Sequence, residues 1–150
     1  MEFERFGDRY VLRLDPGEEA ASTLRAFAAH ENIRGGYLVG FGAFSRVRLC
    51  YFDVGANTYR PHHLDRQVEV VSLLGSIAYG SGHPMLHLHA AVSDAAARTY
   101  SGHLSEGTVY PTLEVFLTRL AGELRRERDP RTGLELLALA RSFQPAARAA

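Results

Sequence analysis

From Tyr37 to Leu137, nearly every segment of the 150-residue chain has the residue content or the alternation of a β-strand. Val47, Leu49 and Tyr51 are separated by arginines and a cysteine, and this period of two is typical of a half-buried strand. Clusters of turn-forming residues divide the strand segments at short intervals. Short turns join antiparallel neighbours, so the pattern predicts a mostly antiparallel sheet.

Only one stretch predicts a main helix, at about residues 17–31. Asp15 can cap the first turn, Pro16 fits the first helical position and Glu18 completes a capping-box pattern. Apolar residues follow at helical spacing: Ala20, Leu24, Phe27 and Ala28. One helix beside many strands predicts an α+β fold.

The segment Leu113–Leu120 fits two kinds of element. Its apolar residues are spaced as on a helix, whereas its Val, Phe and Thr content after Pro111 is typical of a strand. We interpret it as a strand.

Composition limits the classes of function. The 17 basic and 17 acidic residues give no net charge, whereas nucleic-acid binders usually have a basic excess. All the basic residues are arginines, so lysine-based Schiff-base chemistry and a P-loop lysine are excluded. Cys50 is the only cysteine, which excludes an internal disulfide and a cysteine-based zinc cluster. Without a signal peptide or a membrane span, the expected location is the cytoplasm.

Three of the seven histidines have a spacing that predicts a metal site. His87 and His89 are two residues apart in a predicted strand, so both imidazoles lie on one face. A turn at Asp94–Ala97 places His103 opposite either His87 or His89 in an antiparallel hairpin. Three histidines with an open coordination position are typical of catalytic zinc sites, although iron, nickel, copper and cobalt also suit them.

Two carboxylates interrupt apolar segments. Glu69 lies among valines, and Glu114 lies between Leu113 and Val115. A buried carboxylate is costly without a partner, so either residue is a candidate general base or an anchor for a histidine N–H. The alternative is an outward-facing strand residue paired with one of the arginines.

The order of four motifs resembles the plants-and-prokaryotes conserved (PPC) domain. These are Leu38-Val39-Gly40-Phe41-Gly42-Ala43, Val68-Glu69-Val70-Val71-Ser72-Leu73-Leu74-Gly75, His87-Leu88-His89, and Gly102-His103-Leu104 with Gly107 and Tyr110-Pro111-Thr112-Leu113-Glu114-Val115. The resemblance runs from about Tyr10 to Leu137. We therefore expect one PPC-like domain over residues 1–139 and a flexible tail over residues 140–150.

The resemblance implies a strongly curved antiparallel sheet and a homotrimer. Prokaryotic members are usually described as DNA-binding proteins, by analogy with plant relatives that carry an AT-hook. This chain contains no Arg-Gly-Arg-Pro core of an AT-hook. The fold is also similar to that of acetolactate decarboxylase, which holds a metal on three histidines.

Two functions follow as hypotheses. The first is a metal-binding PPC-domain protein that acts as a DNA-binding or regulatory trimer. The alternative is an enzyme in which His87, His89 and His103 hold a divalent ion, most simply Zn²⁺, that acts on a small keto or hydroxy acid. Arg46 or Arg48 would then bind the carboxylate of that small-molecule ligand.

Overall fold

The computed structural model describes residues 1–141, which form one helix and nine strands. The helix α1 spans Ala20–His30. The strands are β1 (Glu2–Phe6), β2 (Arg9–Leu14), β3 (Gly36–Asp53), β4 (Thr58–Leu64), β5 (Val68–Gly80), β6 (His83–Ser93), β7 (Thr99–Arg119), β8 (Arg125–Arg128) and β9 (Glu135–Ala138). The predicted α+β class and the predominance of strands are confirmed. The predicted tail falls mainly on residues 142–150, which lie outside the described part of the chain.

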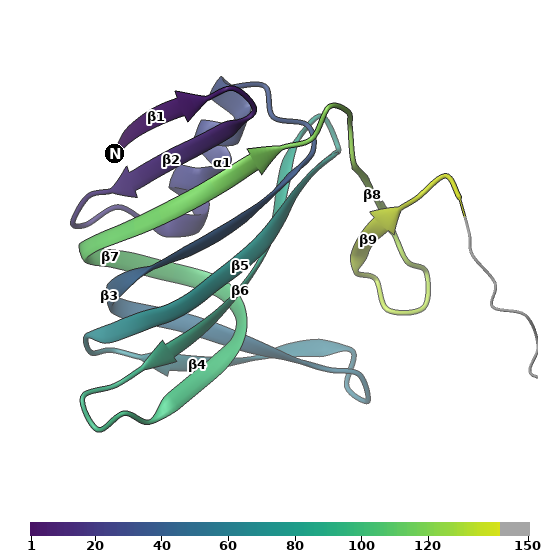
Figure 1. Ribbon diagram of the computed structural model, residues 1–150. Helices are drawn as coiled ribbons and strands as arrows, with labels where there is room; N and C mark the ends of the chain where they lie inside the picture. The colour runs from purple at the N-terminus through teal and green to yellow at the C-terminus, as the bar shows by residue number, and fades with distance from the viewer. Residues whose placement is uncertain (142–150) are drawn as a thin grey trace, which may run out of the picture.

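All strands belong to a single curved sheet (Figure 1). Its main path runs β1-β2-β7-β3-β5-β8-β9, while β4 pairs with β3, and β6 pairs with both β5 and β7. Every pairing is antiparallel except the short contact between β5 and β8. The segment Leu113–Leu120 continues β7 through Arg119, so its interpretation as a strand is confirmed.

Irregular pairing between the two long strands bends the sheet. The register of β3 against β7 shifts at three places, and such bulges increase local twist. Gly42 lies at one of them with a φ of +149°, where a side chain would meet the backbone of Thr112. The helix α1 contacts β6 and β7, the two strands that also carry the histidines.

The hydrophobic core lies between α1 and the inner face of the sheet. Tyr10, Leu12 and Leu14 alternate on β2 and are almost completely buried. On the helix, Leu24 and Phe27 meet them, and the Phe27 ring packs edge-on against Tyr10 with centroids 5.4 Å apart. Burying side chains of this size contributes roughly 1.5–3 kcal/mol each, so this contact holds the helix on the sheet.

The start of the helix differs from the predicted position. The Glu18 carboxylate accepts the backbone N–H of Asp15, as the capping-box pattern indicates, but the helix begins at Ala20 with Glu19 as its N-cap. Gly17 has a φ of +89°, which an α-helix cannot contain, and its N–H donates to the carbonyl of Val109 on β7. The prediction of a start near residue 17 was wrong because sheet contacts hold that turn.

The outer face of the sheet carries an apolar strip. Its members are Tyr37, Val39, Phe41, Leu74 and Phe116, each between 42% and 54% exposed. Phe41 stacks on Phe116 with ring centroids 6.2 Å apart. Within residues 1–141, no helix is both long and apolar enough to cross a membrane.

Candidate metal centre

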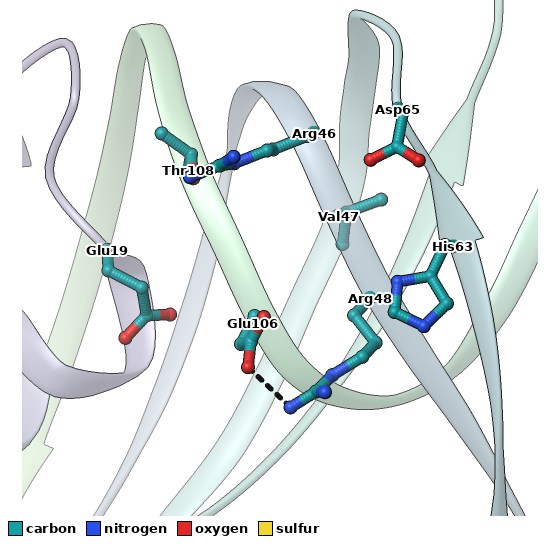
Figure 2. Close-up of a pocket in the computed structure, with 8 residues that line it drawn as sticks. All are labelled: Glu19, Arg46, Val47, Arg48, His63, Asp65, Glu106 and Thr108. Carbon is teal, nitrogen blue, oxygen red and sulfur yellow. Dashed lines mark hydrogen bonds and ion pairs between the residues drawn. The ribbon is translucent and has the colours of Figure 1, made fainter.

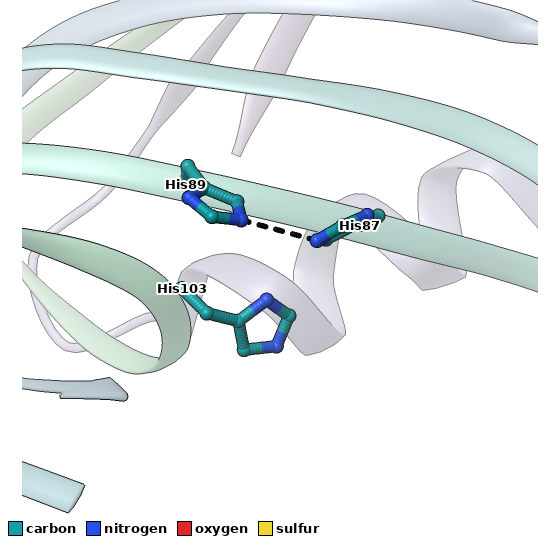
Figure 3. A group of neighbouring side chains, drawn as sticks. All are labelled: His87, His89 and His103. Atoms are coloured by element: carbon teal, nitrogen blue, oxygen red, sulfur yellow. Dashed lines mark hydrogen bonds between the residues drawn. The ribbon is translucent and has the colours of Figure 1, made fainter. Parts of the chain in front are cut away.

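The hairpin of β6 and β7 brings the three histidines together. His89 lies directly opposite His103 in the antiparallel register. Of the two predicted placements for His103, the structure selects this one. His87 precedes His89 by two residues and faces the same side of β6 (Figure 3).

A charged turn sets this register. Asp94 lies between the two strands, and its carboxylate accepts the backbone N–H groups of Ala96 and Arg98 at 2.9 and 3.1 Å. The guanidinium of Arg98 donates to the same carboxylate at 3.0 Å. These bonds hold the pKa of Asp94 down at about 2, chiefly through the Arg98 side chain. An ionised Asp94 therefore fixes the turn that places His103 opposite His89.

A glycine allows β7 to approach β3 beside the cluster. Gly102 precedes His103, and a Cβ atom there would lie 2.8 Å from the carbonyl oxygen of Cys50. That separation is shorter than real Cβ contacts, so any larger residue would push the strands apart. Gly102 is thus a packing requirement of the position next to His103.

The three imidazoles converge closely. The Nε2 atoms of His87 and His89 lie 3.1 Å apart, and His103 lies with its ring centroid 5.2 Å from that of His87 and 5.6 Å from that of His89. One ring nitrogen from each residue lies within 4.8 Å of the other two. Figure 3 shows one nitrogen of His103 turned toward the pair.

These positions fit a metal ion. Zn–N bonds of about 2.0–2.1 Å place the nitrogens of a tetrahedral site roughly 3.3 Å apart, close to the separation of His87 and His89. The Nδ1 atom of His103 is buried and has no hydrogen-bond partner among the described residues. A buried polar atom without a partner costs free energy, and coordination would remove that cost.

The surroundings of His87 and His103 lower the pKa of both imidazoles. Partial burial lowers the pKa of His87 to about 4, and the positive charge of Arg126 adds to this effect. Burial also lowers the pKa of His103, with a further contribution from His89. A metal ligand must be deprotonated, so at neutral pH His87 and His103 each offer a free lone pair without first releasing a proton.

A small cavity of about 150 Å³ adjoins the cluster. Its walls combine residues from β4, β6 and β7 with residues from β8, β9 and the turn between them. They are Tyr59, Leu86, His87, His103, Arg126, Leu134, Glu135 and Leu136. The Tyr59 ring lies 5.1 Å from that of His103. Sequence reasoning missed Tyr59, Arg126 and Glu135, because they come from segments far from the histidines along the chain.

The two predicted carboxylates lie elsewhere on the sheet. Glu69 is an exposed residue opposite Ser93, close to the turn end of the β6–β7 hairpin. Glu114 is half-buried and lies opposite Arg13 on β2 and Phe41 on β3. The structure does not bring either carboxylate into the lining of the histidine cavity.

The arginines suggested for a ligand carboxylate line a different pocket (Figure 2). Arg48 donates to Ser105 and pairs with Glu106, and Arg46 donates to the hydroxyl of Thr108 at 3.1 Å. At the pocket's edge, Glu19 accepts N–H groups from Ala21, Ser22 and Gly107. Glu19, Arg46, Arg48 and Glu106 thus bind neighbouring protein groups in this pocket, while the buried Nε atom of Arg48 has no partner among the described residues.

The fold is shared with acetolactate decarboxylase. The enzyme from Bacillus subtilis strain 168 superimposes with a TM-score of 0.54 at 13% identity, over 73% of this chain and 51% of that one. The similarity concerns the fold alone.

Relatives with higher identity match nearly the whole chain. A metal-containing protein of Archaeoglobus fulgidus is 30% identical with a TM-score of 0.82, over 92% of this chain and 97% of that one. A candidate DNA-binding protein of Ralstonia eutropha JMP134 is 29% identical with a TM-score of 0.86, over 91% and 95%.

A curated relative is much longer. The bifunctional protein GlmU of Synechococcus sp. strain JA-3-3Ab is 34% identical over 131 residues, which are 85% of this chain and 20% of that protein. The present chain thus spans about a fifth of that relative's length.

The sequence model of one family matches residues 1–121, which include all three histidines and the strands that carry them. The chain therefore belongs to the Plants and Prokaryotes Conserved domain family.

Proposed function

We propose that this protein binds one divalent metal ion per chain through His87, His89 and His103, and that the ion binds a small oxygen-containing ligand. The observation that carries the proposal is the convergence of three ring nitrogens within 4.8 Å of one another on one strand pair. Among the relatives, the Archaeoglobus protein is named as metal-containing, which agrees with a site of this kind.

Zinc is the ion that we propose first, because it takes histidine nitrogens in tetrahedral sites. Three protein ligands leave one position open, and an ion with an open position polarises a carbonyl or lowers the pKa of a bound water. The chain's own contribution is to hold the three nitrogens close together and to provide the small cavity beside them. Glu69 and Glu114, which the sequence analysis identified, remain candidates for moving a proton.

Titration of metal-free protein with Co²⁺ tests this proposal. We expect visible absorption typical of tetrahedral Co²⁺, saturating at one equivalent, and its loss in His87→Ala and His89→Ala. His63→Ala is the matched control, because His63 is an exposed strand histidine outside the cluster. Equal Co²⁺ binding by all four proteins, or none by the parent, would overturn the proposal.

We also propose that the protein assembles as a trimer in a reducing compartment such as the cytoplasm. The apolar strip supports self-association, because large exposed apolar patches mark contact surfaces. Leu74 is 54% exposed and lies directly opposite His89, so association would bury surface next to the cluster. Analytical ultracentrifugation should give three times the chain mass for the parent and a smaller species for Leu74→Arg; a monomeric parent would contradict the assembly.

DNA binding is the second candidate, and the name of the Ralstonia relative favours it. The zero net charge of this chain works against it, because phosphate contacts supply most non-specific affinity. Fluorescence anisotropy with a labelled duplex at physiological salt is the test. A Kd of about 10⁻⁶ M or tighter would support DNA binding, and no binding up to about 10⁻⁴ M would exclude it.

A further inference from the structure

The hairpin of β8 and β9 lies beyond the part of the chain that the family model matches, residues 1–121. It nevertheless forms one wall of the histidine cavity through Arg126, Leu134, Glu135 and Leu136. A single parallel contact between Tyr79 and Arg125 joins it to the edge of the sheet. The hairpin therefore adds a charged wall to a site that the rest of the domain builds from neutral side chains.

Arg126 is the cation of this wall, and its guanidinium is held in place. Its Nη2 atom donates to the Ser76 hydroxyl at 2.9 Å, and its Nη1 atom donates to the backbone carbonyl of Glu135 at 2.6 Å. Its Nε atom is buried and has no partner among the described residues. A guanidinium carries five N–H donors, so the two bonds orient the group and leave donors over for a ligand.

The charges around the cavity favour an anion. Histidine ligates a metal as the neutral imidazole, so three histidines leave the full charge of a divalent ion uncompensated, and Arg126 adds another positive charge. Glu135 is the carboxylate among the lining residues, and it also faces Arg126. With the ion bound, two positive charges therefore remain after Glu135 is counted.

The size of the cavity limits the ligand. Its volume is about 150 Å³, compared with about 300–1,000 Å³ for drug-sized ligands. A water molecule takes up about 30 Å³ in the liquid, so the cavity holds a group of only a few heavy atoms. Leu86, Leu134 and Leu136 make the rest of the wall apolar. A short carboxylic acid with a small apolar end fits this combination.

We infer that Arg126 is a specificity-determining residue, which binds the carboxylate of a small hydroxy or keto acid whose other oxygen occupies the open position of the metal. This inference rests on the proposed metal site and assigns its ligand class. A carboxylate accepts two N–H bonds from a guanidinium in one plane, and such charge-assisted bonds are about twice as strong as neutral ones. Arg126 thereby takes the place that the sequence suggested for Arg46 or Arg48.

The test compares lactate with lactamide on the Co²⁺-loaded protein, by the change in visible absorption. Lactamide has nearly the same shape as lactate and no negative charge. We expect lactate to bind at least tenfold more tightly than lactamide. In Arg126→Gln, lactate affinity should fall at least tenfold and by more than lactamide affinity, while Co²⁺ still binds at one equivalent.

A second variant separates ligand binding from a purely structural role of Arg126. Glu135 holds Arg126 through its backbone carbonyl, so Glu135→Gln keeps that hydrogen bond and removes only the negative charge. Lactate should bind this variant more tightly than it binds the parent. The gain should be smaller when Glu135→Gln is introduced into Arg126→Gln, whereas a merely structural Arg126 predicts the same gain in both backgrounds.

Unchanged lactate affinity in both variants, with normal Co²⁺ binding, would overturn the inference and leave the metal site standing. Failure of the parent to bind Co²⁺ would instead overturn the proposed function on which the inference rests. Circular dichroism identifies a variant that has lost its fold. If Arg126→Gln has lost its fold, the test rests on Glu135→Gln. A lactate affinity of Glu135→Gln equal to that of the parent would then overturn the inference.

Discussion

Two polar sites on the same sheet differ in the groups that their side chains bind. In the pocket of Figure 2, Arg48 pairs with Glu106, Arg46 binds Thr108, and Glu19 accepts three backbone N–H groups, although the buried Nε atom of Arg48 has no partner in the described residues. In the histidine cluster of Figure 3, the rings face one another, and the buried Nδ1 of His103 has no partner in the described part of the chain.

This difference indicates that the pocket of Figure 2 has a structural role and that the histidine cluster is a binding site. Arg48 and Glu106 compensate each other's charge without a ligand, and the bonds of Glu19 tie the start of α1 to β7. Imidazoles gathered at one point gain little from each other, because a pair of them shares at most one hydrogen bond. We therefore expect substitutions in the first site to change stability, and substitutions in the second to change metal binding.

The largest expected effect is on metal affinity in His103→Ala. Removing one of three ligands should weaken Zn²⁺ binding by at least about 100-fold, since loss of even an outer hydrogen-bond partner costs 10–100-fold. Competition with a chromophoric chelator measures this affinity. Arg48→Ala is the control from the other site, and its Zn²⁺ affinity should stay within about twofold of the parent. An equal loss of Zn²⁺ affinity in His103→Ala and Arg48→Ala would contradict the distinction between the two sites.

The next effect is on stability in Glu19→Ala. The substitution removes the helix N-cap and leaves the N–H groups of Ala21, Ser22 and Gly107 without their acceptor. We expect the free energy of unfolding to fall by about 1–2 kcal/mol in urea denaturation. Zn²⁺ affinity should be unchanged. A variant as stable as the parent would show that solvent replaces the carboxylate at no cost.

The smallest effect concerns pH and the turn that aligns His89 with His103. The folded-state pKa of Asp94 is about 2, below the usual 3.8 of an aspartate, mainly because Arg98 donates to it. Asp94 therefore stabilises the fold above about pH 4, and this contribution is lost as pH falls from about 4 to 2. In thermal unfolding of metal-free protein, the Tm difference between the parent and Asp94→Asn should shrink over that range. A difference independent of pH would contradict the assignment.

Local patterns predicted much of the fold and the centre of the site. Alternation identified the strands, and the i, i+2 spacing placed His87 and His89 on one face. Counting residues from the turn at Asp94 predicted that His103 lies opposite His87 or His89, because hairpin register depends on a few neighbouring residues.

Long-range contacts were beyond such reasoning. The helix does not start near Gly17, because the backbone of Gly17 is hydrogen-bonded to β7 in a non-helical conformation. Arg126 reaches the histidines through a hairpin whose position against β5 depends on one backbone bridge and the Ser76 contact. The sequence left open whether Glu69 serves the site or faces outward, and it could not show how far along the sheet this exposed residue is from His89.

The central claim is that the three histidines hold a metal ion, and anomalous X-ray diffraction at the zinc edge tests it most directly. Crystals of tag-free protein grown with one equivalent of Zn²⁺ should show one strong peak per chain, about 2.0–2.1 Å from one nitrogen each of His87, His89 and His103. A map without that peak, in which the Nε2 atoms of His87 and His89 keep their direct contact of 3.1 Å, would contradict the account.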